Sequence, residues 1–273
     1  MGEMTFEILI PVRNPTDVFN RTVESLAAQT DKSFSVLISD NFSKSGQEHI
    51  SHALATLSAA GITARRIQPP AEVGRVEHWN WVHYQSAADW LKPLFAGDWL
   101  EPDYFQTARA IAAKEPKCGY IYFNYLYHRG EEVSGGTSPW RADKLWTPAE
   151  AQDIVMRCAM QFGPPSVAVY RRDVFLRSGG YDPSLPICAD SLFFCKLAAR
   201  HGAHGVSRVG THFNIHAARF SDALPGKQRE TRRETFRYYA ELGATAWHER
   251  WRFPKLGYLR LFAREFFRRN RVR

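Results

Sequence analysis

Three aspartates of this 273-residue chain, Asp40, Asp98 and Asp190, stand where a carboxylate could hold a ligand or take up a proton. Asp40 and Asp98 follow apolar stretches that predict strands, and Asp190 lies at the start of a predicted helix. A carboxylate can accept a hydrogen bond, bind a hard cation or act as a general base. Each also has a structural alternative: Asp40 and Asp98 can cap turns, and Asp190 can be the N-cap of a helix from Ser191.

The end of the first apolar stretch is a further candidate site. Phe6–Val12 predicts a buried strand, and it passes into the turn Pro11-Val12-Arg13-Asn14. No G-x-G-x-x-G sequence follows this strand, and no G-x-x-x-x-G-K-[ST] sequence occurs in the chain. The phosphate-binding loops built from those sequences are therefore not expected.

Strand and helix patterns alternate from the N-terminus, as in βαβ units around a parallel sheet. We predict an α/β fold with a mixed, mostly parallel sheet flanked by helices. The predicted strands are Phe6–Val12, Phe34–Ser39, Ala64–Ile67, Leu91–Ala96, Tyr120–Tyr127, Val167–Tyr170 and Val206–Ile215. The predicted helices are one capped by Thr16 or Asp17, then 47–60, 76–87, 103–114, 149–160 and 189–202.

Ligands of open α/β sheets bind beyond the carboxyl ends of the strands. The residues that follow the predicted strands are Pro11 to Asn14, Asp40 to Ser43, and Gly97 with Asp98. Asp190, at a helix start, comes from the second half of the chain. We expect Asp40, Asp98 and Asp190 to border one cleft.

Several ordered segments together resemble a known family. They are ILIPVRN (8–14), SLAAQT (25–30), VLISDNFS (36–43), Asn80, FAGDWLEP (95–102), GGYD (179–182) and Ala189-Asp190. In this order and spacing they resemble the inverting family-2 glycosyltransferases of the bacterial surface-polysaccharide type, over about residues 5–221. The resemblance implies a GT-A (Rossmann-like) fold. It also implies transfer of a sugar from a nucleoside-diphosphate sugar, a UDP-sugar by preference, to a hydroxyl of a glycan or lipid-linked acceptor.

The resemblance also implies roles for individual residues. Asp190 matches the general base that takes the proton of the acceptor hydroxyl. The donor-binding residues it implies are Pro11, Val12, Arg13, Asn14, Asp40, Asn41, Arg75, Asn80, Gly97 and Asp98.

A divalent cation, Mg²⁺ or Mn²⁺, is implied as well, with Asp98 and His216 as its ligands. The chain departs from the family here, because Phe95 and Gly97 stand where further acids are common. One carboxylate together with substrate phosphates can still hold Mg²⁺. An ordinary polar contact is the alternative for His216.

The net charge of +8 lies in the C-terminal tail, where residues 250–273 hold nine Lys or Arg against Glu265 alone. Aromatic and aliphatic residues interleave with these bases, a composition suited to an anionic membrane surface. The alternative is a basic amphipathic helix packed on the domain. We divide the chain into a domain over 1–225, with halves 1–127 and 128–225, and a basic helical extension over 226–273.

The other bulk features limit the class of protein. The four cysteines show no metal-binding spacing, so we expect buried thiols and no disulfide. No stretch could span a bilayer, so we expect a cytoplasmic protein, with peripheral attachment to the inner face of the cell membrane as a hypothesis. Nucleic acid is not an expected partner, because residues 1–249 carry no excess charge. The rival to an enzyme is a noncatalytic nucleotide-sugar-binding or membrane-scaffold protein of the same fold.

Overall fold

The computed structural model describes residues 4–135, 143–158, 165–215 and Glu234. Its strands are β1 Phe6–Val12, β2 Ser35–Asp40, β3 Thr63–Ile67, β4 Trp90–Pro93, β5 Trp99–Leu100, β6 Tyr120–Arg129, β7 Glu132–Gly135, β8 Lys144–Trp146, β9 Ala168–Arg171 and β10 Ala203–Asn214. Its helices are α1 Val18–Ala27, α2 Gln47–Ala59, α3 Arg75–Tyr84, α4 Tyr104–Lys114, α5 Pro148–Cys158, the 3₁₀ turn η1 Pro165–Val167, α6 Arg172–Ser178 and α7 Ala189–His201.

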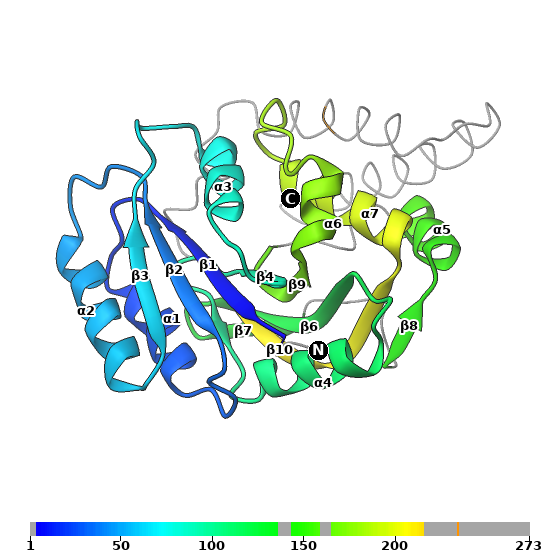
Figure 1. Cartoon of the computed structure of the whole chain (residues 1–273), viewed down its shortest axis with the longest axis horizontal. Helices are drawn as coiled ribbons and strands as arrows, with labels where there is room; N and C mark the ends of the chain where they lie inside the picture. Colours follow the sequence, from blue (N-terminus) through cyan, green and yellow to red (C-terminus); the bar gives the residue numbers. More distant parts are fainter. Residues whose placement is uncertain (1–3, 136–142, 159–164, 216–233, 235–273) are drawn as a thin grey trace, which may run out of the picture.

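The strands in these ranges form one mixed sheet in the order β3-β2-β1-β4-β9-β6-β10-β5, with β7 paired to β6 and β8 to β10 (Figure 1). The pairs β3–β2, β2–β1 and β1–β4 are parallel. Strand β9 is antiparallel to both β4 and β6, and β10 is parallel to β6. The six strands β1, β2, β3, β4, β6 and β10 therefore point to the same edge, called here the carboxyl edge. The prediction of a mostly parallel sheet is confirmed.

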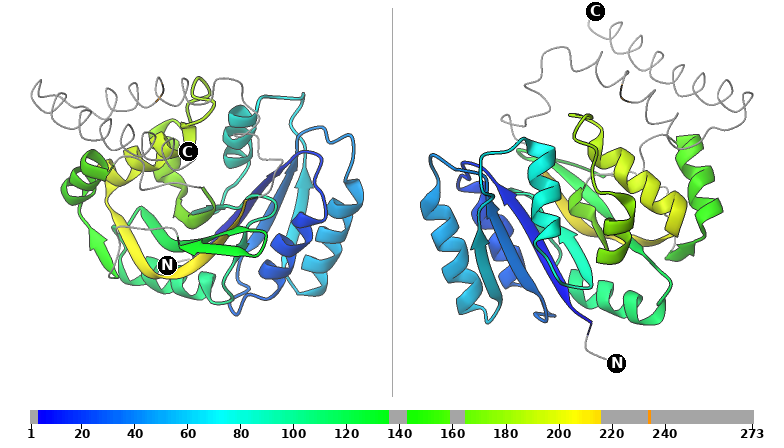
Figure 2. Two further views of the ribbon diagram at one scale, coloured as in Figure 1. Left: turned by 180° about the vertical axis from the view of Figure 1, so that it is seen from behind. Right: turned by 45° about the horizontal axis from the view of Figure 1, so that its top comes forward.

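Helices cover both faces of the sheet, as Figure 2 shows. Alternate side chains of β1 enter two cores: Ile8 and Ile10 pack with α1, α2 and α4, whereas Leu9 packs with α3, α6 and α7. All three side chains are fully buried. A strand covered on both faces has an almost continuous apolar sequence, which explains the run FEILIPV.

Short elements are the main corrections to the predicted fold. No strand was predicted between Tyr127 and residue 149, but β7 and β8 extend the sheet there. The helix α6 and the two-residue strand β5 were also not predicted, because segments this short carry too few residues to show a period. Helix α3 ends at Tyr84 instead of residue 87, and the Ser86 carbonyl beyond it accepts a hydrogen bond from Arg172 at 2.6 Å.

Two further predictions fall on the end of the chain. His216 and the extension 226–273, apart from Glu234, lie outside the described residues. Within the described ranges, none of the helices is long and apolar enough to cross a membrane.

Candidate active site

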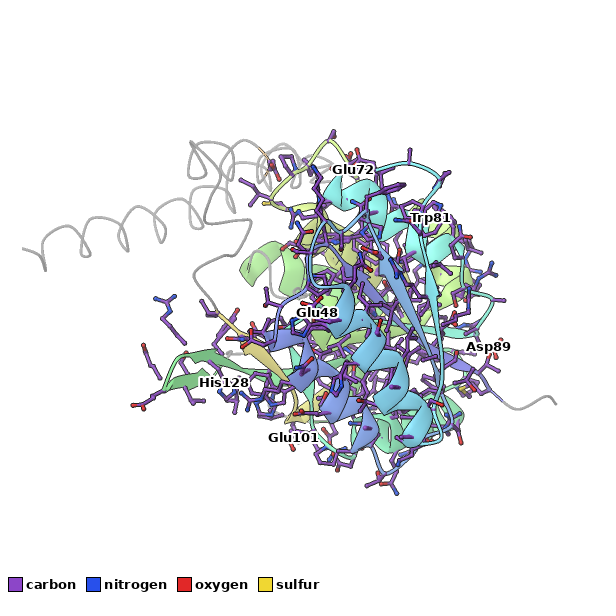
Figure 3. The ribbon with its side chains drawn as sticks, turned by 90° about the vertical axis from the view of Figure 1, so that its left-hand side faces the viewer. Glu48, Glu72, Trp81, Asp89, Glu101 and His128 are labelled. Atoms are coloured by element: carbon purple, nitrogen blue, oxygen red, sulfur yellow. The ribbon has the colours of Figure 1, made fainter. Side chains whose placement is uncertain are left out.

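Helix starts and strand ends gather at the carboxyl edge. Helices α1, α2 and α3 each follow a strand that ends there, and α7 starts there because it precedes β10 in the chain. In Figure 3, Glu48 at the start of α2 and Glu72 before α3 mark this side, and Asp89, before β4, marks the other. Helix N-termini direct N–H groups and partial positive charge outward, so this edge favours anionic groups.

The turn after β1 is fastened to the loop after β2 mainly by Asn14. Its backbone has φ +50°, and its N–H donates to the Ser43 hydroxyl at 2.8 Å. Its side-chain oxygen accepts from the Lys44 N–H at 2.7 Å. Arg13 is exposed and pairs with Glu72. Both predicted residues are therefore at the edge, and Asn14 shapes the turn.

Asn41 has a comparable role on the next loop. Its N–H donates to the Val12 carbonyl at 2.9 Å, and its side-chain amide exchanges two hydrogen bonds with the backbone of Val73, at 2.8 and 3.1 Å. Val73 lies just before α3. Asn41 therefore positions the loop that leads to Arg75.

Asp40 is fully buried at the end of β2. Its carboxylate accepts from the Ser43 N–H at 3.0 Å, and it pairs with Arg66. Burial by itself would raise the pKa of Asp40, but the hydrogen bonds from Ser43, Gln47 and Arg66 hold it below the ordinary value. Asp40 thus has the turn-capping role that the sequence left open, and its role in binding the donor stays a prediction.

Gly97 and Asp98 form the turn between β4 and β5. Gly97 has φ +100°, a conformation that favours glycine, and its N–H donates to the Thr22 hydroxyl at 2.9 Å. One oxygen of Asp98 accepts from the Ser166 hydroxyl at 2.6 Å, and the other accepts from the Asn214 N–H at 3.2 Å. Asp98 is buried and holds the turn against η1 and the end of β10.

Lys92 and Ser166 were missed by the sequence analysis. Lys92 is fully buried, and it donates to the Ser166 carbonyl. Burial lowers the pKa of Lys92 well below its ordinary value, and the charge of Asp98 opposes that shift. The available signal was a lysine inside the apolar stretch 90–96, where an ammonium group needs a buried partner.

Asp190 lies in the first turn of α7, whose N-cap is Cys188, so the predicted N-cap role is wrong by two positions. Its carboxylate accepts from the Ser191 N–H at 2.7 Å. Burial raises the pKa of Asp190, opposed by that hydrogen bond and by the charge of Arg75. Asp190 is therefore a stronger base than an exposed aspartate.

Arg75 and Asn80 line the same region from α3. Arg75 donates to the Pro186 carbonyl and lies over the ring of Trp79, 4.6 Å from its centroid. Asn80 exchanges two hydrogen bonds of 2.8 Å with the backbone of Tyr181. Gly180 has φ +76°, and a Cβ there would lie 2.5 Å from the Asn80 side-chain oxygen. The GGYD segment therefore closes against Asn80, and Asn80 positions this loop.

Helix α3 connects the three aspartates. Its His78 interacts electrostatically with Asp40, and its Arg75 with Asp190. Trp79 stacks on Phe95, at 5.0 Å between ring centroids, in the segment that ends at Asp98. The structure thus brings Asp40, Asp98 and Asp190 to one edge around one helix.

The fold is similar to that of several solved structures. S. aureus TarS 1-349 in complex with UDP-GlcNAc matches with TM-score 0.69 and 15% identity, over 86% of this chain and 66% of that chain. The mannosyltransferase PcManGT from Pyrobaculum calidifontis, in complex with GDP-Man and Mn²⁺, matches with TM-score 0.60 and 11% identity, over 86% of this chain and 63% of that one. GalNAc-T7 with UDP, GalNAc and Mn²⁺ matches with TM-score 0.61 and 15% identity, over 89% of this chain and 48% of that one.

These neighbours are GT-A glycosyltransferases, and this chain has the GT-A fold. It spans less than two thirds of the length of each of these three chains. No protein-family model matches the sequence, and no curated protein matches it. A fold alone does not define an activity, which depends on the residues at the site.

Of the two predicted metal ligands, the described residues include Asp98 but not His216, so the metal site stays a prediction. Both oxygens of Asp98 already accept hydrogen bonds from the chain, and the Lys92 ammonium group interacts electrostatically with them. Over residues 4–135, 143–158 and 165–215 there is no group of three or more His, Cys, Asp or Glu side chains that could hold a metal ion. His216, the second predicted ligand, is outside these ranges. No catalytic step is therefore assigned to a metal.

Proposed function

We propose that the chain is a glycosyltransferase that moves a sugar from a nucleoside-diphosphate sugar to an acceptor hydroxyl, with inversion at the anomeric carbon. The observation that carries this proposal is Asp190. It is a partly buried carboxylate with a raised pKa, on the same edge of a GT-A fold as Asp40 and Asp98. Perturbed pKa values of this kind are typical of functional sites.

In this mechanism Asp190 accepts the proton of the acceptor hydroxyl. The acceptor oxygen forms its bond to the anomeric carbon while the bond to the diphosphate breaks, and the nucleoside diphosphate leaves with the electron pair. Such a reaction needs a base on the side opposite the leaving group. Burial strengthens Asp190 as that base, and Arg75 favours its ionised form.

The donor is assigned to the strand ends. Pro11 to Asn14, Asp40 and Asn41 would contact the nucleoside, and Gly97 with Asp98 would lie near the diphosphate. TarS and GalNAc-T7 hold UDP-GlcNAc and UDP in their complexes, which supports a UDP-sugar as the donor. The proposed acceptor is a glycan or lipid-linked alcohol, reached by the domain 1–225 while residues 250–273 lie on an anionic membrane.

Asp190→Asn tests the catalytic role. An amide cannot accept the proton, so transfer should fall by about 100-fold or more, measured as nucleoside diphosphate release with a panel of UDP-sugars and acceptors. The shift in melting temperature caused by UDP should remain, because Asp190 is assigned to the acceptor side. Asp153→Asn, which removes an exposed carboxylate on α5, is the matched control. Full activity of Asp190→Asn would exclude Asp190 as the base.

The same assays separate the rival function. The engagement of both Asp98 oxygens by the chain itself favours a noncatalytic nucleotide-sugar-binding or scaffold protein as the second candidate. Such a protein would show a melting-temperature shift with UDP but neither transfer nor hydrolysis of any donor.

A further inference from the structure

Glu234, from the part of the chain beyond β10, is buried at the start of α7. The residue is 2% exposed. One carboxylate oxygen accepts from the Cys188 N–H at 2.7 Å, and the two oxygens accept from the Ile187 N–H at 3.1 and 3.2 Å. Cys188 is the N-cap position of α7, and cysteine is not a residue type that caps helices. A carboxylate distant in the sequence therefore binds the N–H groups of the N-cap residue and of the residue before it.

The segment Pro186-Ile187-Cys188 is held from two sides. Glu234 binds its N–H groups, and Arg75 donates to the Pro186 carbonyl. Arg75 also interacts electrostatically with both Glu234 and Asp190. The two carboxylates thus interact with one half-buried guanidinium group, and the segment that Glu234 binds leads directly into Asp190.

We propose that Glu234 is a positioning residue for Asp190, an inference that rests on the proposed function. By fixing the last amides before α7, Glu234 sets where the first turn begins, and hence where the Asp190 carboxylate lies. By sharing Arg75, it keeps the guanidinium group from pairing with Asp190 alone. Glu234 lies in the region assigned above to the extension 226–273, so this region contributes to the site whatever its remaining residues do.

The sharing of Arg75 between Glu234 and Asp190 should be measurable in the pH dependence of the rate. Among the residues that the structure describes, the charged and titratable groups that face Asp190 are Arg75 on α3 and Tyr181 in the loop after α6, with Glu234 next to Arg75. Loss of the Glu234 charge removes a nearby anion and leaves Asp190 as the carboxylate with which Arg75 interacts. Both changes favour the ionised form of Asp190, so the acidic limb of the rate profile should move to lower pH.

Glu234→Gln is the test, because glutamine keeps the size of the side chain and one acceptor oxygen. We expect kcat to fall by about 10- to 100-fold, the effect of a misplaced catalytic group, with KM for the donor little changed and the acidic limb of kcat/KM at lower pH. Glu234→Asp should be similarly impaired, because its shorter side chain does not reach both amides. Glu132→Gln, on the exposed strand β7, is the matched control and should behave as the wild type.

A double variant separates positioning from general damage. If Glu234 acts through Asp190, then Glu234→Gln should reduce the residual rate of Asp190→Asn by less than two-fold, whereas independent effects would multiply. Wild-type kcat and an unmoved pH profile in Glu234→Gln would overturn the inference, and so would multiplicative losses in the double variant. Full activity of Asp190→Asn alone would instead overturn the proposed function, so the two failures are distinguishable.

Discussion

Asp98 joins three separate segments of the chain through a single carboxylate. It accepts from Ser166 in η1 and from Asn214 at the end of β10, while its own turn follows β4. Ser166 in turn accepts from Lys92 and from the Thr211 hydroxyl, at 3.0 Å in the latter case. Buried polar networks stabilise a fold only when every member has a partner. Asp98 is therefore a structural residue, whatever it contacts in the donor.

Asp98→Asn should consequently lower the free energy of unfolding with no donor or metal present. We expect a loss of about 1–3 kcal/mol, because Lys92 loses its nearby anion and one hydrogen bond gains a mismatched partner. Urea unfolding measures this loss. Asp103→Asn, at an exposed ion pair with Arg208, is the control and should change little.

An increase in the free energy of unfolding on Asp98→Asn would instead identify a metal site. Ligand carboxylates repel one another when no cation is present, so removing one of them stabilises the empty protein. If Asp98→Asn stabilised the chain and abolished an Mn²⁺-dependent shift with UDP, the structural role would be wrong. We expect UDP to raise the melting temperature of the wild-type chain to the same extent with and without Mn²⁺.

At the scale of elements, α3 organises the site because it carries polar residues on its buried side. His83 is buried. Its Nδ1 lies 2.6 Å from the Trp79 carbonyl, and its Nε2 lies 2.6 Å from the Tyr170 hydroxyl. A carbonyl can only accept, so Nδ1 carries the proton and Nε2 accepts from Tyr170. Burial lowers the pKa of His83 to about 4, and that of His78 likewise to about 4.

These histidines make the stability of the fold depend on pH. Each is neutral in the folded chain, whereas in the unfolded chain each binds a proton below its ordinary pKa of 6.5. The stability is therefore complete above about pH 6.5 and is lost as the pH falls toward 4. His83→Asn keeps a donor for the Trp79 carbonyl and cannot ionise. Its loss of unfolding free energy between pH 7 and pH 4.5 should be about 2 kcal/mol smaller than that of the wild type.

Urea unfolding at several pH values between 7 and 4.5 measures this difference. His52→Asn, at an exposed position on α2, is the control and should keep the wild-type slope. Equal slopes for His83→Asn and the wild type would mean that His83 titrates normally.

At the scale of the whole molecule, the sequence could predict what depends on strand direction. Asp40 and Asp98 follow parallel strands, so their meeting at one edge follows from the alternation of strands and helices. The partners of these residues could not be predicted, because they come from distant segments: Arg66 for Asp40, and Ser166 for Asp98. Glu234 is the extreme case, since nothing in its neighbourhood distinguishes it from the other charged residues around it. Sequence periodicity locates elements, whereas packing selects the side chains that complete a site.

The basic tail is the remaining prediction at this scale. Residues 250–273 hold nine Lys or Arg among aromatic residues, and each base near an anionic leaflet contributes roughly 1 kcal/mol. The full chain should therefore float with vesicles that contain phosphatidylserine, and binding should fall with added salt because the surface charges are screened. A chain that ends at residue 249 should stay unbound, and vesicles of phosphatidylcholine alone should bind neither form.

Truncation also distinguishes the two roles that the sequence allows for this tail. A membrane-binding segment can be removed with little change in melting temperature, whereas an amphipathic helix packed on the domain would expose apolar surface when removed. We therefore expect the shortened chain to melt within a few degrees of the full chain and to transfer sugar to a soluble acceptor at the same rate. A large drop in melting temperature together with undiminished flotation would show that the tail belongs to the fold and that another surface binds the membrane.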